Sequence, residues 1–318
     1  MNYNFDPEIQ PWVAMLPDMG PLTDIPATRA RMAELKHMLP RYEPVNPVTV
    51  RDTTVPGPEG APDVPVRVYT PDNEPGPKPA VLRIHGGGFV MGNLDMDAAI
   101  SLTLADEVGA VVVSVDYRLA PEHPFPAAPE DCYAALVWLA KNAAELGVDP
   151  ARVAVAGDSA GGGLAASVAL LARDRGGPGL VLQVLNIPEL DDRLTSPSMT
   201  AFTDTPMWNR PSAVISWDSY LGEGVRGTGD VSPYAAPARA TDLSGLPPAF
   251  VATCEFDPLR DEGLDYGARL VQAGVPTELH LYPGTFHGSS FLAEVAVTQR
   301  MRRDLVDAVR RALRSMPR

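Results

Sequence analysis

Ser159 is the residue whose surroundings most directly indicate covalent chemistry, because glycines stand two positions before and two positions after it, at 157 and 161. Residues 153–156 form a short apolar run typical of a buried strand, and residues 164–173 have the composition of a helix. A Gly-x-Ser-x-Gly turn between a strand and a helix holds its serine in a strained conformation at the tip of the strand. Ser159 is therefore predicted to be a nucleophile; a glycine-rich helix entry that only packs is the alternative.

A serine hydroxyl is a weak nucleophile at neutral pH and needs a histidine to accept its proton. When the serine lies on a strand–turn–helix element, the acid and then the histidine follow it along the chain. Only His280 and His287 follow Ser159. His280 lies within the alternating strand pattern of residues 277–282, whereas His287 comes after it in a loop. His287 is the predicted base, and activity is expected to fall below about pH 6 when the base is protonated.

The acid that orients the histidine is expected in the loop after an earlier strand. Asp257 directly follows the apolar run at 249–256, and we predict that it accepts a hydrogen bond from Nδ1 of His287. A helix N-cap is the alternative role for this aspartate. The weaker candidates for the acid are the runners-up Asp191 and Asp192 and the neighbours Glu255 and Asp261.

A run of three glycines follows the predicted strand at 80–84. Glycines can adopt positive φ and turn successive N–H groups toward one point, where an oxyanion would form. We predict that the N–H groups of Gly87, Gly88 and Ala160 surround the substrate carbonyl oxygen. A flexible turn is the alternative reading of the glycine run. The residues expected to support this machinery are His85, Gly86, Asp158 and Tyr117.

The segments that must position these residues alternate between strands and helices from residue 80 onward. This alternation predicts βαβ crossovers and a mostly parallel sheet covered by helices on both faces, an α/β fold. An antiparallel hairpin is expected at one edge, at 48–50 and 64–69, and the later strands at 80–84, 111–117, 153–156, 180–187, 249–254 and 277–282. Helices are expected at 27–38, 96–109, 127–146 (with Gly147 as its C-cap), 164–173, 262–273 and 290–316.

Residues 188–246 interrupt this alternation without a strand pattern. An insertion of this length is usually a lid or a binding segment. Together with the N-terminal residues it is predicted to form a small helical cap over the sheet's C-terminal edge, where ligands of α/β proteins bind. The predicted division is 1–46 (first part of the cap), 47–187 (core), 188–246 (cap insertion) and 247–318 (rest of the core).

Composition narrows the class of protein. The 318 residues carry a net charge of −14, which makes nucleic acid an unlikely partner. No run of 18 apolar residues and no signal-peptide pattern occur, so a cytoplasmic protein without a membrane span is expected. The two cysteines, Cys132 and Cys254, have apolar neighbours and are expected to be buried thiols. No metal and no cofactor are expected.

Five motifs in this order resemble the hormone-sensitive lipase family of α/β-hydrolases: His85-Gly-Gly-Gly, Asp116-Tyr-Arg-Leu-Ala-Pro-Glu-His-Pro-Phe-Pro-Ala, Gly157-Asp-Ser-Ala-Gly-Gly, Asp257-Pro-Leu-Arg-Asp-Glu-Gly and Phe286-His287-Gly. The resemblance implies a capped α/β-hydrolase that acts as a serine carboxylesterase on short- to medium-chain acyl esters. It carries over Ser159, Asp257 and His287 as the triad and Gly87, Gly88 and Ala160 as the oxyanion hole. A homodimer formed through the last strand is also implied.

The chain departs from this family pattern after the strand that ends near Ile187. Relatives often have Tyr-Pro there, whereas this chain has Asn186-Ile187-Pro188-Glu189, which leaves the shape of the acyl pocket open. Other functions also stay open: amide or lactone hydrolysis with the same triad, a binding protein on a hydrolase scaffold, or a dinucleotide enzyme. The last rests on Gly161-Gly-Gly-Leu-Ala-Ala, which fits a Gly-x-Gly-x-x-Ala fingerprint.

Overall fold

The computed structural model describes residues 3–16, 22–72 and 76–314. Its strands form one sheet in the order β1-β2-β4-β3-β5-β6-β7-β8. Neighbouring strands from β4 through β8 pair in parallel, whereas β1 pairs antiparallel with β2 and β2 antiparallel with β4. The strands are β1 (Val48–Val55), β2 (Val64–Pro71), β3 (Lys78–Ile84), β4 (Val111–Val115), β5 (Val148–Asp158), β6 (Leu182–Asn186), β7 (Ala249–Phe256) and β8 (Thr277–Phe286). The predicted α/β class and the antiparallel edge hairpin are confirmed.

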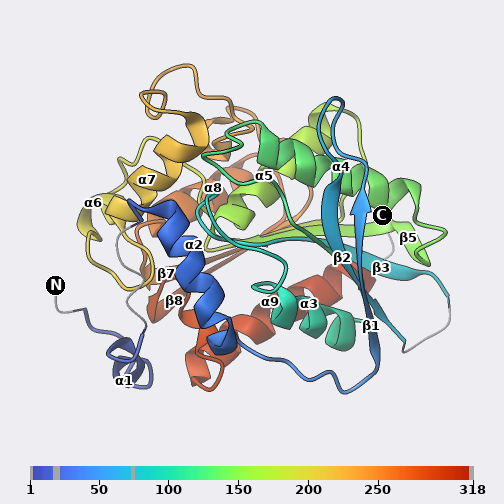
Figure 1. Ribbon diagram of the computed structural model, residues 1–318, viewed down its shortest axis with the longest axis horizontal. Coiled ribbons are helices and arrows are strands. Elements are labelled where there is room, and N and C mark those ends of the chain that lie inside the picture. The colour runs from blue at the N-terminus through green and yellow to red at the C-terminus, as the bar shows by residue number, and fades with distance from the viewer. Residues whose placement is uncertain (1–2, 17–21, 73–75, 315–318) are drawn as a thin grey trace.

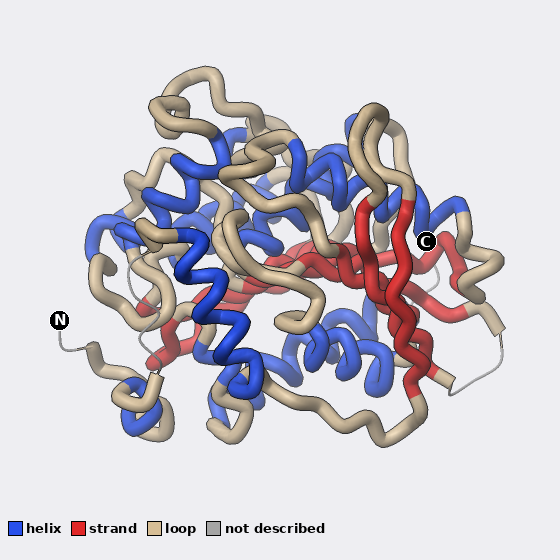
Figure 2. Tube along the Cα trace, in the orientation of Figure 1, coloured by secondary structure: helices blue, strands red, loops and turns tan. Residues whose placement is uncertain are grey.

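Helices cover both faces of this sheet (Figures 1 and 2). In Figure 1, α4, α5 and α8 lie above the sheet, and α3 and α9 lie below it. The helical segments are α1 (Gln10–Val13), α2 (Ile25–Glu34), η1 (Leu35–Met38), α3 (Ala98–Thr103), η2 (Leu104–Val108), α4 (Ala127–Lys141), α5 (Ala160–Asp174), α6 (Pro197–Ala201), α7 (Arg210–Leu221), η3 (Pro237–Arg239), α8 (Arg260–Gln272), η4 (Ser289–Phe291) and α9 (Ala296–Arg314).

Alternate side chains of the central strands fill two separate cores. Leu82 on β3 and Val155 on β5 pack in one buried cluster with residues of α4, α5 and α8. Their neighbours in sequence, Val81 and Ala154, pack in a second cluster with residues of η2 and α9. Successive strand residues point to opposite faces, so a strand covered on both sides needs a nearly continuous apolar run. The short apolar runs in the sequence follow from this arrangement.

Three predicted helix boundaries were wrong, and one of them is the start of α5, which lies at Ala160 rather than at residue 164. The helix predicted to end at residue 146 ends at Lys141, and residues 142–147 follow it as turns; Asn142 has φ −102° and ψ 15°, and its side-chain amide donates to the carbonyl of Trp138 at 2.8 Å. Gly147, the predicted C-cap, has φ +65°, and the N–H groups of Gly147 and Val148 donate to the carbonyls of Ala144 and Ala143 at 3.3 and 2.7 Å, the bonds of a Schellman cap that closes these turns before β5. The last helix begins at Ala296 rather than near 290, and the predicted end at residue 316 lies outside the described residues.

The segment between β6 and β7 contains α6, α7 and η3 and, among its residues, no strand. It packs on the loop after β3, where the rings of Phe89 and Tyr220 stack with centroids 4.1 Å apart. The N-terminal segment contacts the same region, because Arg29 on α2 donates to the carbonyls of Val90 and Ala120 at 2.7 and 2.8 Å. The division into core and cap stays a prediction. The contacts of Tyr220 and Arg29 join the two segments that this prediction assigns to the cap to a loop that it assigns to the core.

Two further expectations concern thiols and membrane spans. Cys132 and Cys254 are buried and free, as predicted, and burial raises the pKa of both thiols. Within the described residues, no helix combines the length and the apolar character needed to cross a lipid bilayer.

Candidate active site

Ser159 is the single residue between β5 and α5, and its backbone is strained. Its φ is +56°, in a region that residues with a side chain rarely adopt. The turn closes only because its neighbours are glycines: a side chain at Gly157 would collide with the carbonyl of Gly161, and one at Gly161 would collide with the carbonyl of Ile84. The strand, the helix and the glycine spacing together present the Ser159 hydroxyl at the C-terminal edge of the sheet.

A continuous chain of hydrogen bonds links Ser159, His287 and Asp257. Nε2 of His287 lies 2.9 Å from Oγ of Ser159, and Nδ1 lies 2.7 Å from Oδ2 of Asp257. The second carboxylate oxygen, Oδ1, accepts the backbone N–H of Leu259 at 2.9 Å. Ser159 and His287 are each 7% exposed and Asp257 is 1% exposed. The structure therefore brings the three predicted residues together from the ends of β5, β7 and β8.

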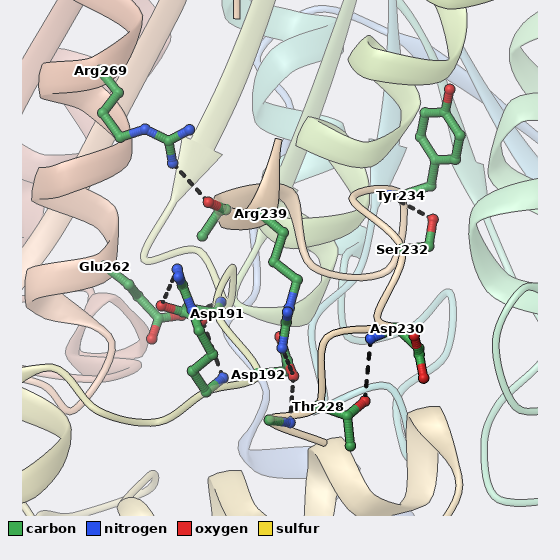
Figure 3. Close-up of polar contacts among 12 residues, drawn as sticks. Asp191, Asp192, Thr228, Asp230, Ser232, Tyr234, Arg239, Glu262 and Arg269 are labelled. Carbon is green, nitrogen blue, oxygen red and sulfur yellow. Dashed lines mark hydrogen bonds and ion pairs between the residues drawn. The ribbon is translucent and has the colours of Figure 1, made fainter. Parts of the chain in front are cut away.

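The other predicted acids have different partners (Figure 3). Asp192 is fully buried, forms an ion pair with Arg239 at 2.5 Å and accepts the N–H of Gly227 at 2.7 Å. Asp191 pairs with Arg193 at 2.7 Å. The contacts of Asp192 tie the start of the insertion between β6 and β7 to its later part, and Asp257 is left as the carboxylate in contact with His287.

The remaining candidates also lie elsewhere. Asp261 forms an ion pair with Arg260 at 2.8 Å, and Glu255 accepts the N–H of Gly284 at 2.7 Å. His280, the second histidine after Ser159, forms a hydrogen bond of 2.8 Å with Glu278 on the same edge strand. None of these described contacts involves His287.

The glycine loop after β3 turns its carbonyl groups away from the pocket. The carbonyl of Gly87 accepts the N–H groups of Val90 and Met91 at 3.2 and 3.0 Å, and that of Gly88 accepts the hydroxyl of Ser216 at 2.9 Å. In the described part of the chain the N–H groups of Gly87 and Gly88 have no acceptor of their own. Both glycines have positive φ, +121° and +56°. The loop thus presents free donors beside Ser159, and Ala160 adds the first N–H of α5.

Asp158 belongs to a buried ionic cluster beneath the serine turn. The fully buried Arg83 pairs with both Asp158 and Asp97, and Nδ2 of Asn186 donates to Asp158 at 2.8 Å. Burial raises the pKa of Asp97 to about 6, with the Arg83 charge opposing that rise. Asp158 therefore anchors the end of β5 to β3 and β6, and its supporting role in catalysis stays a prediction.

His85 and Tyr117 pack as a pair behind the glycine loop. Their rings stack with centroids 4.3 Å apart, and the Tyr117 hydroxyl donates to the His85 carbonyl at 3.0 Å. Nδ1 of His85 lies 2.8 Å from the carbonyl of Gly86, and burial lowers the pKa of the imidazole. A neutral His85 can donate from Nδ1 to Gly86, which holds the start of the loop in place.

One pocket opens at Ser159, and a second pocket adjoins it. The pocket at the triad has a volume of about 280 Å³, and a second pocket of about 890 Å³ shares with it the side chains of Met32, Met91, Met96 and Met207. Trp208 forms one wall of the triad pocket, with its ring centroid 5.9 Å from that of His287. Methionine side chains are flexible and apolar, so these pockets can adapt to different apolar groups.

Sequence reasoning left the surroundings of Ile187 open and did not predict the burial of Glu189 behind the site. Ile187 lines the triad pocket at φ +44°, which is unusual for a β-branched residue. Glu189 is fully buried and hydrogen-bonded to Ser216 at 3.0 Å. A glutamate after a strand is usually exposed, and no pattern in the sequence marks this one as buried.

The glycines that fit a dinucleotide fingerprint pack against the protein itself. Side chains at Gly161 and Gly163 would collide with the carbonyls of Ile84 and Glu189, respectively. Because Gly161 and Gly163 have no side chain, α5 can pack closely against the neighbouring segments. Among the described residues, no group of three or more His, Cys, Asp or Glu side chains is arranged to hold a metal ion.

Comparisons with known proteins agree with this geometry. A family described as having the alpha/beta hydrolase fold matches residues 81–291. Carboxylesterase NlhH of Mycobacterium tuberculosis is 45% identical over 296 residues, which cover 89% of each chain. Esterase LipI of the same organism is 43% identical over 287 residues, 89% of this chain and 87% of the relative. The solved structure of a bacterial heroin esterase is 50% identical, with a TM-score of 0.95 over 98% of this chain and 99% of that one. The chain belongs to the hormone-sensitive lipase family of α/β-hydrolases and is a carboxylic ester hydrolase.

Proposed function

We propose that this protein hydrolyses short- to medium-chain acyl esters through an acyl-enzyme, with Ser159 as nucleophile, His287 as general base and Asp257 as the orienting acid. The observation that carries the proposal is the hydrogen-bonded chain from Ser159 through His287 to Asp257. In the first step Oγ of Ser159 attacks the ester carbonyl while Nε2 of His287 accepts the hydroxyl proton. Asp257 stabilises the imidazolium that results.

The tetrahedral intermediate carries its negative charge on the former carbonyl oxygen. The N–H groups of Gly87, Gly88 and Ala160 are the proposed donors to it, and the first two find no acceptor among the residues that the structure describes, which supports this role. The intermediate collapses when the C–O bond to the alcohol breaks and His287 returns its proton to the leaving oxygen. Water, activated by His287, then attacks the acyl-enzyme and releases the acid.

The proposed substrates are apolar esters with one bulky substituent. The two adjoining pockets supply about 280 and 890 Å³, and their shared methionines give a flexible apolar lining. This room exceeds what an acetyl group requires, so either the acyl chain or the alcohol can be large. The names of the relatives support the ester class, since they are called carboxylesterase, esterase and heroin esterase.

The test is hydrolysis of p-nitrophenyl esters from acetate to dodecanoate by the wild type and by Ser159→Ala, with p-nitrophenyl butyrate's anilide analogue alongside. We expect turnover of the esters only in the wild type, with a maximum at short or medium chain length. Retention of activity in Ser159→Ala would overturn the mechanism. Faster cleavage of the anilide than of the ester would instead assign the same triad to amides.

We also propose that two copies of the chain associate through β8. This strand forms one edge of the sheet and pairs on one side only, with β7. Leu279 and Leu281, which point to the same face of β8, are 39% and 45% exposed. Unpaired edge strands with exposed apolar side chains are favourable sites for strand pairing between chains.

A further inference from the structure

Glu189 contacts both the serine turn and the glycine loop. Its backbone N–H donates to the carbonyl of Ser159 at 3.0 Å, and its Oε1 lies 3.0 Å from Oγ of Ser216. Ser216, on α7, donates in turn to the carbonyl of Gly88 at 2.9 Å. Glu189 and Ser216 have no exposed surface. A buried path of hydrogen bonds therefore runs from the turn that holds the nucleophile to the loop that offers the oxyanion donors.

The hydroxyl of Ser216 has one proton and two neighbouring acceptors, so the protonation of Glu189 decides where that proton goes. A protonated Glu189 can donate from Oε1 to Ser216, which leaves the Ser216 proton for the carbonyl of Gly88. An ionised Glu189 only accepts, and a hydrogen bond to a carboxylate is the stronger one. Ser216 would then donate to Glu189, and the carbonyl of Gly88 would lose its donor.

The surroundings of Glu189 favour its neutral form. Its Oε2 has no hydrogen-bond partner among the described residues, and a buried carboxylate with an unsatisfied oxygen is costly. The titratable groups that face it from the neighbouring elements are Asp257 after β7, Glu262 on α8, Tyr117 after β4 and Tyr220 on α7. None of these four is a cation. Burial raises the pKa of Glu189 to about 8, so the side chain is mostly protonated at pH 7.

We propose that protonated Glu189, acting through Ser216, is a positioning residue that fixes the Gly88 peptide and thereby the oxyanion-binding loop. Gly88 has φ +56°, and its carbonyl accepts from Ser216 while its N–H, which has no acceptor within the described ranges, is available to the substrate. When the carbonyl is released, the glycine backbone can rotate, and the N–H of Gly88 no longer points at the substrate oxygen. Small errors in donor placement weaken transition-state binding far more than substrate binding, so the effect falls on kcat. This inference rests on the proposed esterase mechanism.

The test measures kcat and KM for p-nitrophenyl butyrate from pH 6 to 10, corrected for spontaneous hydrolysis, in the wild type, Glu189→Gln and Ser216→Ala. In the wild type, kcat should decline above about pH 8 as Glu189 ionises. Glu189→Gln supplies a permanent donor to Ser216, so its kcat should stay within about threefold of the wild type at pH 7 and should not show that decline. Ser216→Ala should lose about tenfold in kcat at pH 7 with little change in KM.

Ser219→Ala is the matched control, because this half-buried serine lies on the same helix and makes none of these contacts; it should track the wild type at every pH. The inference is overturned if Glu189→Gln shows the wild-type decline above pH 8, or if Ser216→Ala keeps full kcat. Should Ser216→Ala fail to fold, the pH profile of Glu189→Gln still tests the inference, because that profile compares kcat values at different pH in one folded protein. An inactive wild type, or an active Ser159→Ala, would instead overturn the proposed function.

Discussion

Nδ1 of His287 and Oδ2 of Asp257 lie 2.7 Å apart where both side chains are almost fully buried. The other oxygen of Asp257 accepts the N–H of Leu259, so each carboxylate oxygen has a donor and the side chain is held in one orientation. Because water is largely excluded, the carboxylate is well placed to stabilise an imidazolium on His287. The hydrogen bond to Asp257 therefore favours the tautomer of His287 that carries its proton on Nδ1, which leaves Nε2 able to accept the proton of Ser159.

Replacing Asp257 by Asn should disable the base without removing a comparable volume. The amide can donate to Nδ1, which favours the wrong tautomer of His287 and places a proton on Nε2, facing Ser159. We expect kcat for p-nitrophenyl butyrate to fall by about 10³- to 10⁴-fold. Steady-state kinetics at pH 7 measures this, and a loss of less than tenfold would contradict the role given to Asp257.

Asp192→Asn provides the control at the runner-up acid. Asp192 is equally buried but pairs with Arg239, so its loss leaves an unpaired guanidinium and should lower the free energy of unfolding by about 3 kcal/mol or more. The kcat of the folded Asp192→Asn protein should stay close to that of the wild type. Urea unfolding and kinetics on the same preparation separate the two effects.

A side chain at Gly88 should disturb the oxyanion loop. Its φ is +56°, and a Cβ at this position would collide with the ring of Trp208. We expect Gly88→Ala to lose 10- to 100-fold in kcat, about the effect of misplacing one oxyanion donor. Gly60→Ala is the matched control, because Gly60 also has positive φ (+77°) but open space around it. That control should cost about 1 kcal/mol of stability and leave kcat intact. Equal kcat losses in both variants would argue against a local effect at Gly88.

The triad could be predicted from the sequence because each of its members ends a strand. Ser159, Asp257 and His287 follow β5, β7 and β8, and parallel strands bring their C-terminal ends to one edge of a sheet. The order of the motifs along the chain was therefore enough to place three distant residues together. The glycine loop after β3 follows the same rule.

The rest of the site depends on packing between segments that no local pattern links. Glu189 is buried because α7 brings Ser216 over it, and a single glutamate after a strand does not indicate such a partner. The positive φ of Ile187 is likewise imposed by its surroundings. The end of α4 is a further case: Asn142 leaves helical geometry, its side-chain amide donates to the carbonyl of Trp138, and residues 142–147 continue as turns.

Association through β8 should be sensitive to charge at that edge. Leu281→Lys places a cation among the exposed side chains of β8, and lysines on edge strands oppose pairing between chains. We expect the wild type to elute as a dimer and Leu281→Lys as a monomer in size-exclusion chromatography with light scattering. Val50→Lys is the control, because Val50 is 47% exposed on β1 at the opposite edge of the sheet. A monomeric wild type would contradict the proposed dimer, and a monomeric Val50→Lys would point to the other edge.

The raised pKa of Glu189 also predicts how stability depends on pH. Its pKa is about 8 in the folded protein and about 4.5 in the unfolded chain, so between these values the folded state holds a proton that the unfolded state has released. The contribution of the neutral Glu189 side chain to the free energy of unfolding is fully present below about pH 4.5. It falls by about 1.4 kcal/mol per pH unit as the pH rises toward 8. Glu189→Gln has no such proton. The unfolding free energy of Glu189→Gln minus that of the wild type should therefore grow from pH 5 to 8 and then level off. Urea unfolding at pH 5, 6, 7, 8 and 9 measures this difference, and a constant value across the series would show that Glu189 is already ionised in the folded protein.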